Sequence, residues 1–201
     1  MQVDLRVLEL LSSRLIHELI SPVGAIANGV ELLGDEDPAF AKDAVALIGQ
    51  SARRAGNRLQ FYRFAYGTGG AGGGAPEPKT LIAGILDGGK VSGAWPAAYD
   101  GLPVEWQKLA CNLALLGAEL LPRGGKLILS GQGKKLAANI EGEGINPPAE
   151  VRAALAPGAD VGALTARSVH AYFTARQAER FGAALTLNQS APNRAAVTIG
   201  V

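Results

Sequence analysis

Two long runs of apolar residues at helical spacing fill the first third of the chain and limit the folds open to it. In the first run, apolar side chains recur every three or four residues from Leu8 to Leu33, so they line one face of a helix. The second run, from Ala41 to Tyr66, alternates spacings of four and three, a period of about 3.5 residues that is typical of a left-handed bundle. Between the runs, Gly34 suits a helix end and Pro38 a helix start. We therefore predict an antiparallel hairpin of helices at about residues 3–33 and 38–66.

The hairpin leaves apolar surface without a partner, because two antiparallel helices do not cover each other's stripes fully. Charged residues of the second run, among them Arg58, fall off its stripe and are expected on a solvated face. An exposed apolar strip of this length indicates an interface, and a second copy of the hairpin would close a four-helix bundle. We therefore expect a homodimer. The alternative is that the C-terminal half of the chain packs on the hairpin instead.

The second half of the chain has a different pattern. Residues 67–78 are rich in glycine and proline, which predicts a linker; no Gly-Lys-Ser/Thr follows the glycines, so a phosphate-binding loop is disfavoured. From residue 79 to 201 short strand-like runs alternate with helical ones. We expect helices at 80–86, 104–121 and 165–181, and strands at 126–130, 136–140, 185–187 and 195–199. The predicted class is α+β: a hairpin over 1–66 forming a dimeric four-helix bundle, the linker 67–78, and an α/β sandwich over 79–201 with a mixed or antiparallel sheet.

Composition excludes several classes of partner and site. The net charge is +1, so the chain has no electrostatic footprint for nucleic acid or an anionic membrane. The most apolar run, residues 109–121, is too short and too polar to span a bilayer, and charges among the N-terminal leucines are unlike a signal peptide. A single cysteine, Cys111, allows no internal disulfide and suits a reducing compartment, so we expect a cytoplasmic protein. Two histidines and one cysteine predict no metal site.

The first helix carries a histidine beside an acid and close to a proline. His17 lies about 200° around the helix from Leu15, so it points away from the apolar stripe. An exposed histidine can be meaningless, but Pro22 is not expected inside a helix, where proline costs about 3 kcal/mol and introduces a kink. Together with Glu18, these residues form the pattern H-E-x-x-x-P.

This pattern resembles the phosphoacceptor box of sensor histidine kinases, and the longer run from His17 to Leu33 resembles the ChpT-type histidine phosphotransferases of bacterial two-component phosphorelays. The resemblance implies that His17 takes a phosphoryl group from the receiver domain of a hybrid histidine kinase and passes it to response regulators. It also implies that Glu18 hydrogen-bonds the other ring nitrogen of the histidine, unless it is an ordinary surface acid. No cofactor is expected in this chain, because magnesium and the acceptor aspartate would come from the partner's receiver domain.

The residues around His17 predict a docking surface for that partner. Small or polar residues continue the line of the histidine along the helix, and we expect a receiver to dock on Arg14, Ser21, Pro22, Gly24, Asn28 and Glu31. A glycine inside a helix costs about 1 kcal/mol against alanine, so its presence indicates a need for space. For Gly24 we favour close approach of a partner helix, whereas for Gly29 ordinary helix packing explains the glycine equally well.

The C-terminal half resembles the ATP-binding domain of histidine kinases but departs from it where nucleotide is held. The magnesium-binding asparagine of that family aligns with Leu116, and a leucine cannot ligate a hard cation. The aspartate that binds the adenine amine aligns with Ile140, which cannot accept a hydrogen bond. Gly142 and Gly144 then form only a tight turn, and Asn112 caps or packs within its helix. We expect no ATP binding, and a structural role for His170.

Three functions remain open at this stage. The first is a histidine phosphotransferase that relays phosphate through His17 without autokinase activity. The second is an ATP-using histidine kinase fragment, which Leu116 and Ile140 disfavour. The third is a non-catalytic adaptor or anti-regulator that only binds receiver domains.

Overall fold

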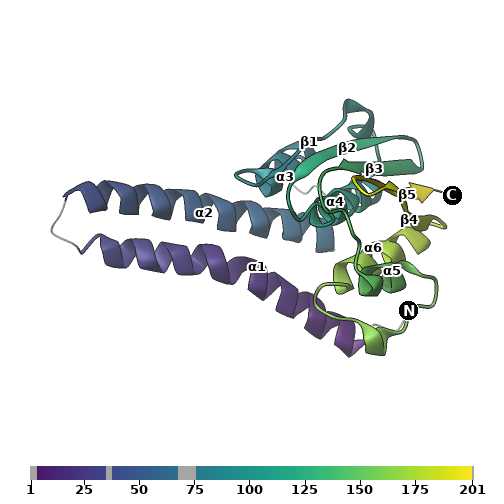
Figure 1. Cartoon of the computed structure of the whole chain (residues 1–201), viewed down its shortest axis with the longest axis horizontal. Coiled ribbons are helices and arrows are strands. Elements are labelled where there is room, and N and C mark those ends of the chain that lie inside the picture. The colour runs from purple at the N-terminus through teal and green to yellow at the C-terminus, as the bar shows by residue number, and fades with distance from the viewer. Residues whose placement is uncertain (1–3, 35–37, 68–75, 201) are drawn as a thin grey trace.

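A computed structural model describes residues 4–34, 38–67 and 76–200. Its first two helices, α1 (Leu5–Leu32) and α2 (Pro38–Tyr66), form an antiparallel hairpin that projects from the rest of the molecule (Figure 1). The Asp4 side chain accepts a hydrogen bond of 2.9 Å from the backbone N–H of Arg6 and caps the start of α1. The hairpin and both helix bounds agree with the sequence prediction to within two residues. Most of the predicted linker, residues 68–75, lies outside the described residues.

Close packing of the two hairpin helices depends on small residues. A Cβ atom on Gly29 would lie 2.6 Å from Ile48 Cγ1, so a side chain there would displace Ile48. Pro22 is buried on the same side of α1, and the helix continues through it without interruption. Ala44 and Ala55 are buried on α2. Gly29 therefore serves packing within the hairpin, as the alternative interpretation held.

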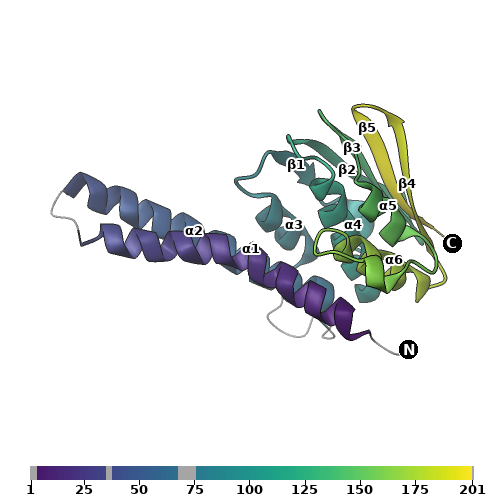
Figure 2. The ribbon, with the colours of Figure 1, turned by 60° about the horizontal axis from the view of Figure 1, so that its bottom comes forward.

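The C-terminal domain is a sheet with helices packed on one face (Figure 2). The five strands lie in the order β1-β2-β3-β5-β4. Strand β1 runs parallel to β2 and the other pairs are antiparallel, so the sheet is mixed. The elements of this domain are α3 (Pro78–Leu86), β1 (Val91–Ala94), the 3-10 turn η1 (Ala97–Tyr99), α4 (Val104–Glu119), β2 (Gly125–Gln132), β3 (Lys135–Glu141), α5 (Ala149–Leu155), η2 (Val161–Ala163), α6 (Val169–Glu179), β4 (Ala184–Ala191) and β5 (Arg194–Gly200).

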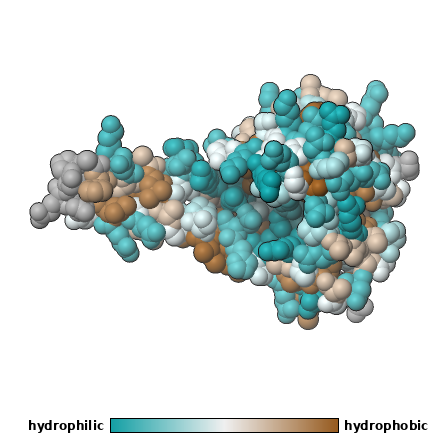
Figure 3. Space-filling model, viewed as in Figure 1, coloured by the Kyte–Doolittle hydropathy of each residue, from teal (hydrophilic) through white to brown (hydrophobic). Residues whose placement is uncertain are grey.

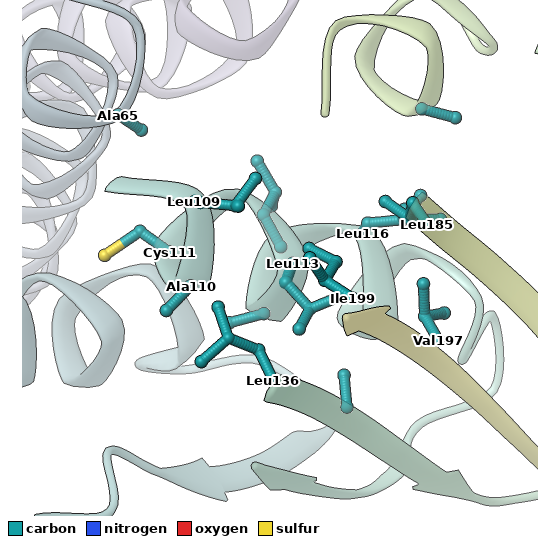
Figure 4. Packing of buried hydrophobic residues seen from close by; sticks show 14 of the residues in the cluster. Ala65, Leu109, Ala110, Cys111, Leu113, Leu116, Leu136, Leu185, Val197 and Ile199 are labelled. Carbon is teal, nitrogen blue, oxygen red and sulfur yellow. The ribbon is translucent and has the colours of Figure 1, made fainter. Parts of the chain in front are cut away.

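The core lies between α4 and the sheet (Figure 4). Helix α4 is buried almost all round, which explains why its sequence is nearly continuous in apolar residues. Alternate residues of the strands point toward it, among them Leu136, Val197 and Ile199. A Cβ atom on Gly117 would lie 2.8 Å from Leu127 Cδ1, so α4 sits directly on the sheet.

One strand and one α-helix were not predicted from the sequence because they are short, and neither were the two 3-10 turns. Strand β1 has four residues and α5 has seven, too few for apolar periodicity to indicate either. Helix α6 begins at Val169, four residues later than predicted. Thr165 and Ser168 instead form a turn in which the backbone N–H of Thr165 donates to Ser168 Oγ at 3.0 Å.

The C-terminal domain covers the base of the hairpin. Arg6 donates from Nε to the carbonyl of Val161 at 3.1 Å and from Nη2 to that of Leu164 at 2.9 Å. Val7 is buried in the same core as the sheet, and Leu10, Leu11 and Leu15 pack against that core. The alternative that the C-terminal half packs on the hairpin therefore holds for its base, whereas the distal part keeps exposed apolar side chains. No described helix is long and apolar enough to cross a membrane.

Candidate functional site

His17 is exposed on α1. Ser21, Gly24, Asn28 and Glu31 follow it within about 40° of one line along the helix, and all four are exposed. We call these five residues the His17 strip. The structure thus gives the histidine an open face with small or polar neighbours, as the docking prediction requires.

Space is available along this strip. A Cβ atom on Gly24 would have no neighbour within 4 Å, in contrast to the tightly packed Gly29. Further along, Asn28 and Glu31 line an open hollow of about 600 Å³. A partner could therefore lie close to the backbone of α1 beyond His17.

Two residues of the predicted docking set are not on the strip. Pro22 is buried on the side of α1 that faces α2. Arg14 is 11% exposed and its guanidinium pairs with Glu119 at the end of α4, while Nη1 donates to the carbonyl of Ala166 at 3.4 Å. Both side chains are occupied within the chain, so little of either faces a partner. The sequence alone placed Arg14 on the docking surface, and it does not show that the C-terminal domain covers this side chain.

Glu18 points about 100° around the helix from His17, and this direction faces α2. Its Oε2 accepts a hydrogen bond from Arg58 Nη1 of α2, and the two side chains are 34% and 33% exposed. In the described part of the chain no hydrogen bond joins Glu18 to His17. The catalytic role of Glu18 stays a prediction. The expectation that Arg58 is simply solvated was wrong, because the register of the hairpin sets it opposite Glu18.

A buried polar network joins α1 to the C-terminal domain. Glu119 accepts from Arg14 through Oε1, and its Oε2 lies 3.2 Å from Nδ1 of the fully buried His170. Nε2 of His170 lies 3.3 Å from Asn112 Oδ1. Asn112 Nδ2 in turn donates to the carbonyl of Ala65 at 3.0 Å. Asn112 does pack within the protein, but it links three helices, and His170 has the structural place expected for it.

The network stabilises the charged forms of both Arg14 and Glu119, as the shifts of their pKa values show. Burial disfavours the Glu119 carboxylate, but His170 and Arg14 outweigh it, so the pKa of Glu119 lies below its ordinary value. Burial likewise opposes the charge of Arg14, and Glu119 outweighs it, so the pKa of Arg14 is raised. Burial also raises the pKa values of Tyr62 and Tyr66, which line this region from α2. The pair is therefore ionised at neutral pH.

The two residues that align with nucleotide-binding residues of histidine kinases are part of the core. Leu116 and Ile140 are 2% and 1% exposed. A Cβ atom on Gly117 would lie 3.5 Å from Ile140 Cγ2, so α4 packs directly over that strand residue. Gly144 has a φ of +69°, consistent with the predicted turn. Among the described residues, no three His, Cys, Asp or Glu side chains gather as a metal site would require.

Known proteins are similar to this chain in sequence and fold. The family model of the histidine phosphotransferase C-terminal domain matches residues 75–193. The protein phosphotransferase ChpT of Brucella abortus (strain 2308) is 34% identical over 189 residues, which are 90% of each chain. A solved structure of a bacterial phosphotransferase covers 99% of this chain and 98% of its own, with 31% identity and a TM-score of 0.75. The chain therefore belongs to the histidine phosphotransferase family.

Proposed function

We propose that this protein relays a phosphoryl group between receiver-domain aspartates through His17. The observation that carries the proposal is the His17 strip, an exposed histidine in line with open, small and polar positions on one helix. Its likeness to a protein phosphotransferase over 90% of the chain supports the same activity. The partners are then receiver domains of a hybrid histidine kinase and of response regulators, which suits a cytoplasmic protein.

The chemistry needs one nucleophilic nitrogen and little else from this chain. The lone pair of an imidazole nitrogen of His17 attacks the phosphorus of an aspartyl phosphate in line. The P–O bond breaks, its electron pair returns to the aspartate carboxylate, and an N–P bond forms. The other ring nitrogen keeps its proton, and a carboxylate beside it, such as Glu18, stabilises the charged ring. Attack by the aspartate of a second receiver reverses the step, with magnesium supplied by the receivers.

We propose further that the chain does this without ATP and without autokinase activity. The side chains of Leu116 on α4 and Ile140 on β3 offer no oxygen to a cation or to adenine, and both are buried in the core. An isothermal titration with Mg-ATP should show no binding. Micromolar affinity would contradict this part of the proposal and favour a kinase.

The functional unit that we propose is a homodimer. Ile16, Ile20, Val23 and Val30 are each more than half exposed and form what we call the apolar face of α1. Figure 3 shows apolar side chains gathered on the hairpin outside the C-terminal domain. This face lies about 100° around the helix from the His17 strip. A second hairpin could therefore cover it as a four-helix bundle and leave the histidine open.

Incubation with a receiver domain carrying radiolabelled aspartyl phosphate tests the proposal. The chain should acquire acid-labile, base-stable label, as a phosphohistidine does, and then pass it to a second receiver. His17→Ala should abolish the labelling, whereas His170→Gln, at the buried histidine, should retain it. Binding of the receiver without any transfer of label would instead identify an adaptor.

A further inference from the structure

Arg58 differs from the other arginines of α2. Arg53, Arg54 and Arg63 are exposed, whereas Arg58 is half-buried and pairs across the hairpin with Glu18. Glu18 follows directly after the candidate phosphoacceptor His17. The arginine therefore acts on the carboxylate nearest in sequence to the reacting imidazole.

The ion pair with Arg58 engages one of the two carboxylate oxygens of Glu18. Arg58 Nη1 donates to Oε2 of Glu18, and within the described residues Oε1 has no hydrogen-bond donor. A glutamate on a helix surface samples several rotamers, and a charge-assisted bond to a guanidinium selects among them. A carboxylate oxygen left free in this way can accept a hydrogen bond from an imidazole N–H.

We propose that Arg58 is a positioning residue for phosphotransfer, acting through Glu18. This inference rests on the proposed function. Arg58 holds Glu18 in one place at the level of His17, with Oε1 free to accept from the imidazole as the ring becomes positively charged. Arg58 itself touches neither the ring nor the phosphoryl group, so its contribution disappears when the Glu18 carboxylate is removed.

A double-mutant cycle on the transfer rate measures this dependence. Rapid-quench transfer from a radiolabelled phosphorylated receiver, at several receiver concentrations, gives a maximal rate and a half-saturating concentration. A positioned general acid–base group contributes roughly 10²–10⁴-fold to a rate, and we expect Arg58→Ala to forfeit about tenfold of it with half-saturation unchanged. Arg58→Lys should recover part of the rate. In a Glu18→Ala background, Arg58→Ala should have no further effect.

Two controls make the result decisive. Arg53→Ala removes an exposed arginine of the same helix and should leave the rate unchanged, and Arg58→Gln repeats the cycle with a side chain that preserves bulk without charge. An equal loss from Arg58→Ala with and without Glu18 would overturn the inference, as would a change confined to half-saturation, which indicates docking. If the unmutated chain accepts no label, the proposed function fails together with the inference. That outcome differs from failure of the inference alone, in which the unmutated chain is labelled but the Arg58→Ala effect does not depend on Glu18.

Discussion

Replacing Glu119 by glutamine should destabilise the protein more than the same change at an exposed glutamate of its described ion pairs. Glu119 accepts from Arg14, which is 11% exposed, and lies 3.2 Å from His170, which has no exposed surface. Glutamine keeps the volume but leaves a buried guanidinium without its counter-charge. Breaking a buried pair in this way costs about 3–5 kcal/mol. Because Glu119 itself is 27% exposed, solvent screens part of the effect, and we expect about 2–3 kcal/mol.

Chemical denaturation at neutral pH measures this loss, with a thermal melt as a second observable. For a chain of this size each kcal/mol corresponds to about 2–4 °C, so the midpoint should fall by about 4–12 °C. Glu143→Gln is the matched control, because Glu143 also pairs with an arginine of the same domain, Arg123, at 3.7 Å, but both side chains are largely exposed. An equal effect of the two substitutions would refute the reasoning.

The pH dependence of the same variant has a definite sign. The pKa of Glu119 is lowered in the folded protein, so its contribution to stability is complete above the ordinary value of 4.5 and is lost as pH falls through the lower folded value. The difference in unfolding free energy between the unmutated protein and Glu119→Gln should therefore be constant near neutrality and shrink below about pH 4.5. A difference that grows on acidification would contradict the assignment.

The remaining predictions concern the two exposed faces of α1. Gly24→Leu should slow transfer at least tenfold while the chain stays folded, because a side chain there meets no atom of this chain but fills the space left for a partner; receiver-binding and transfer kinetics measure it. Gly29→Leu should instead lower stability, because its Cβ would lie 2.6 Å from Ile48 Cγ1, and thermal melts of the two variants separate the roles. Ile20→Lys should weaken self-association by placing a charge on the apolar face of α1, which light scattering at micromolar concentration detects; an unmutated chain that is already monomeric would remove the dimer proposal.

Periodicity was enough to predict the hairpin, because each helix is long and its pattern is dictated by one face. The run of residues 38–66 gave the bounds of α2 directly. The exposure of His17 and Gly24 also followed from helical geometry alone, since both lie off the buried side. These predictions need only local information, and the structure agrees with them.

Pairings between segments could not be predicted in the same way. Arg58 has the same sequence signature as its exposed neighbours on α2, and only the register of the hairpin sets it opposite Glu18. Arg14 lies one turn before His17 and was expected to face a partner. Its burial depends on how the C-terminal domain docks, and Glu119, its counter-charge, is more than a hundred residues away. Position on a helix determines which residues share a face, but not what covers that face.

The two arginine–glutamate pairs also explain how α1 can present its histidine steadily. Arg14 and Glu18 are four residues apart and therefore lie on the same side of the helix. Arg14, which precedes His17, is paired with Glu119 of α4, and Glu18, which follows it, is paired with Arg58 of α2. These two ion pairs oppose rotation of α1 about its axis. In the proposed transfer, a phosphoryl donor reaches His17 in line. Because the C-terminal domain is bound to the base of α1 and its aligned nucleotide positions are buried, the arrangement favours a donor that arrives from outside, along the open His17 strip.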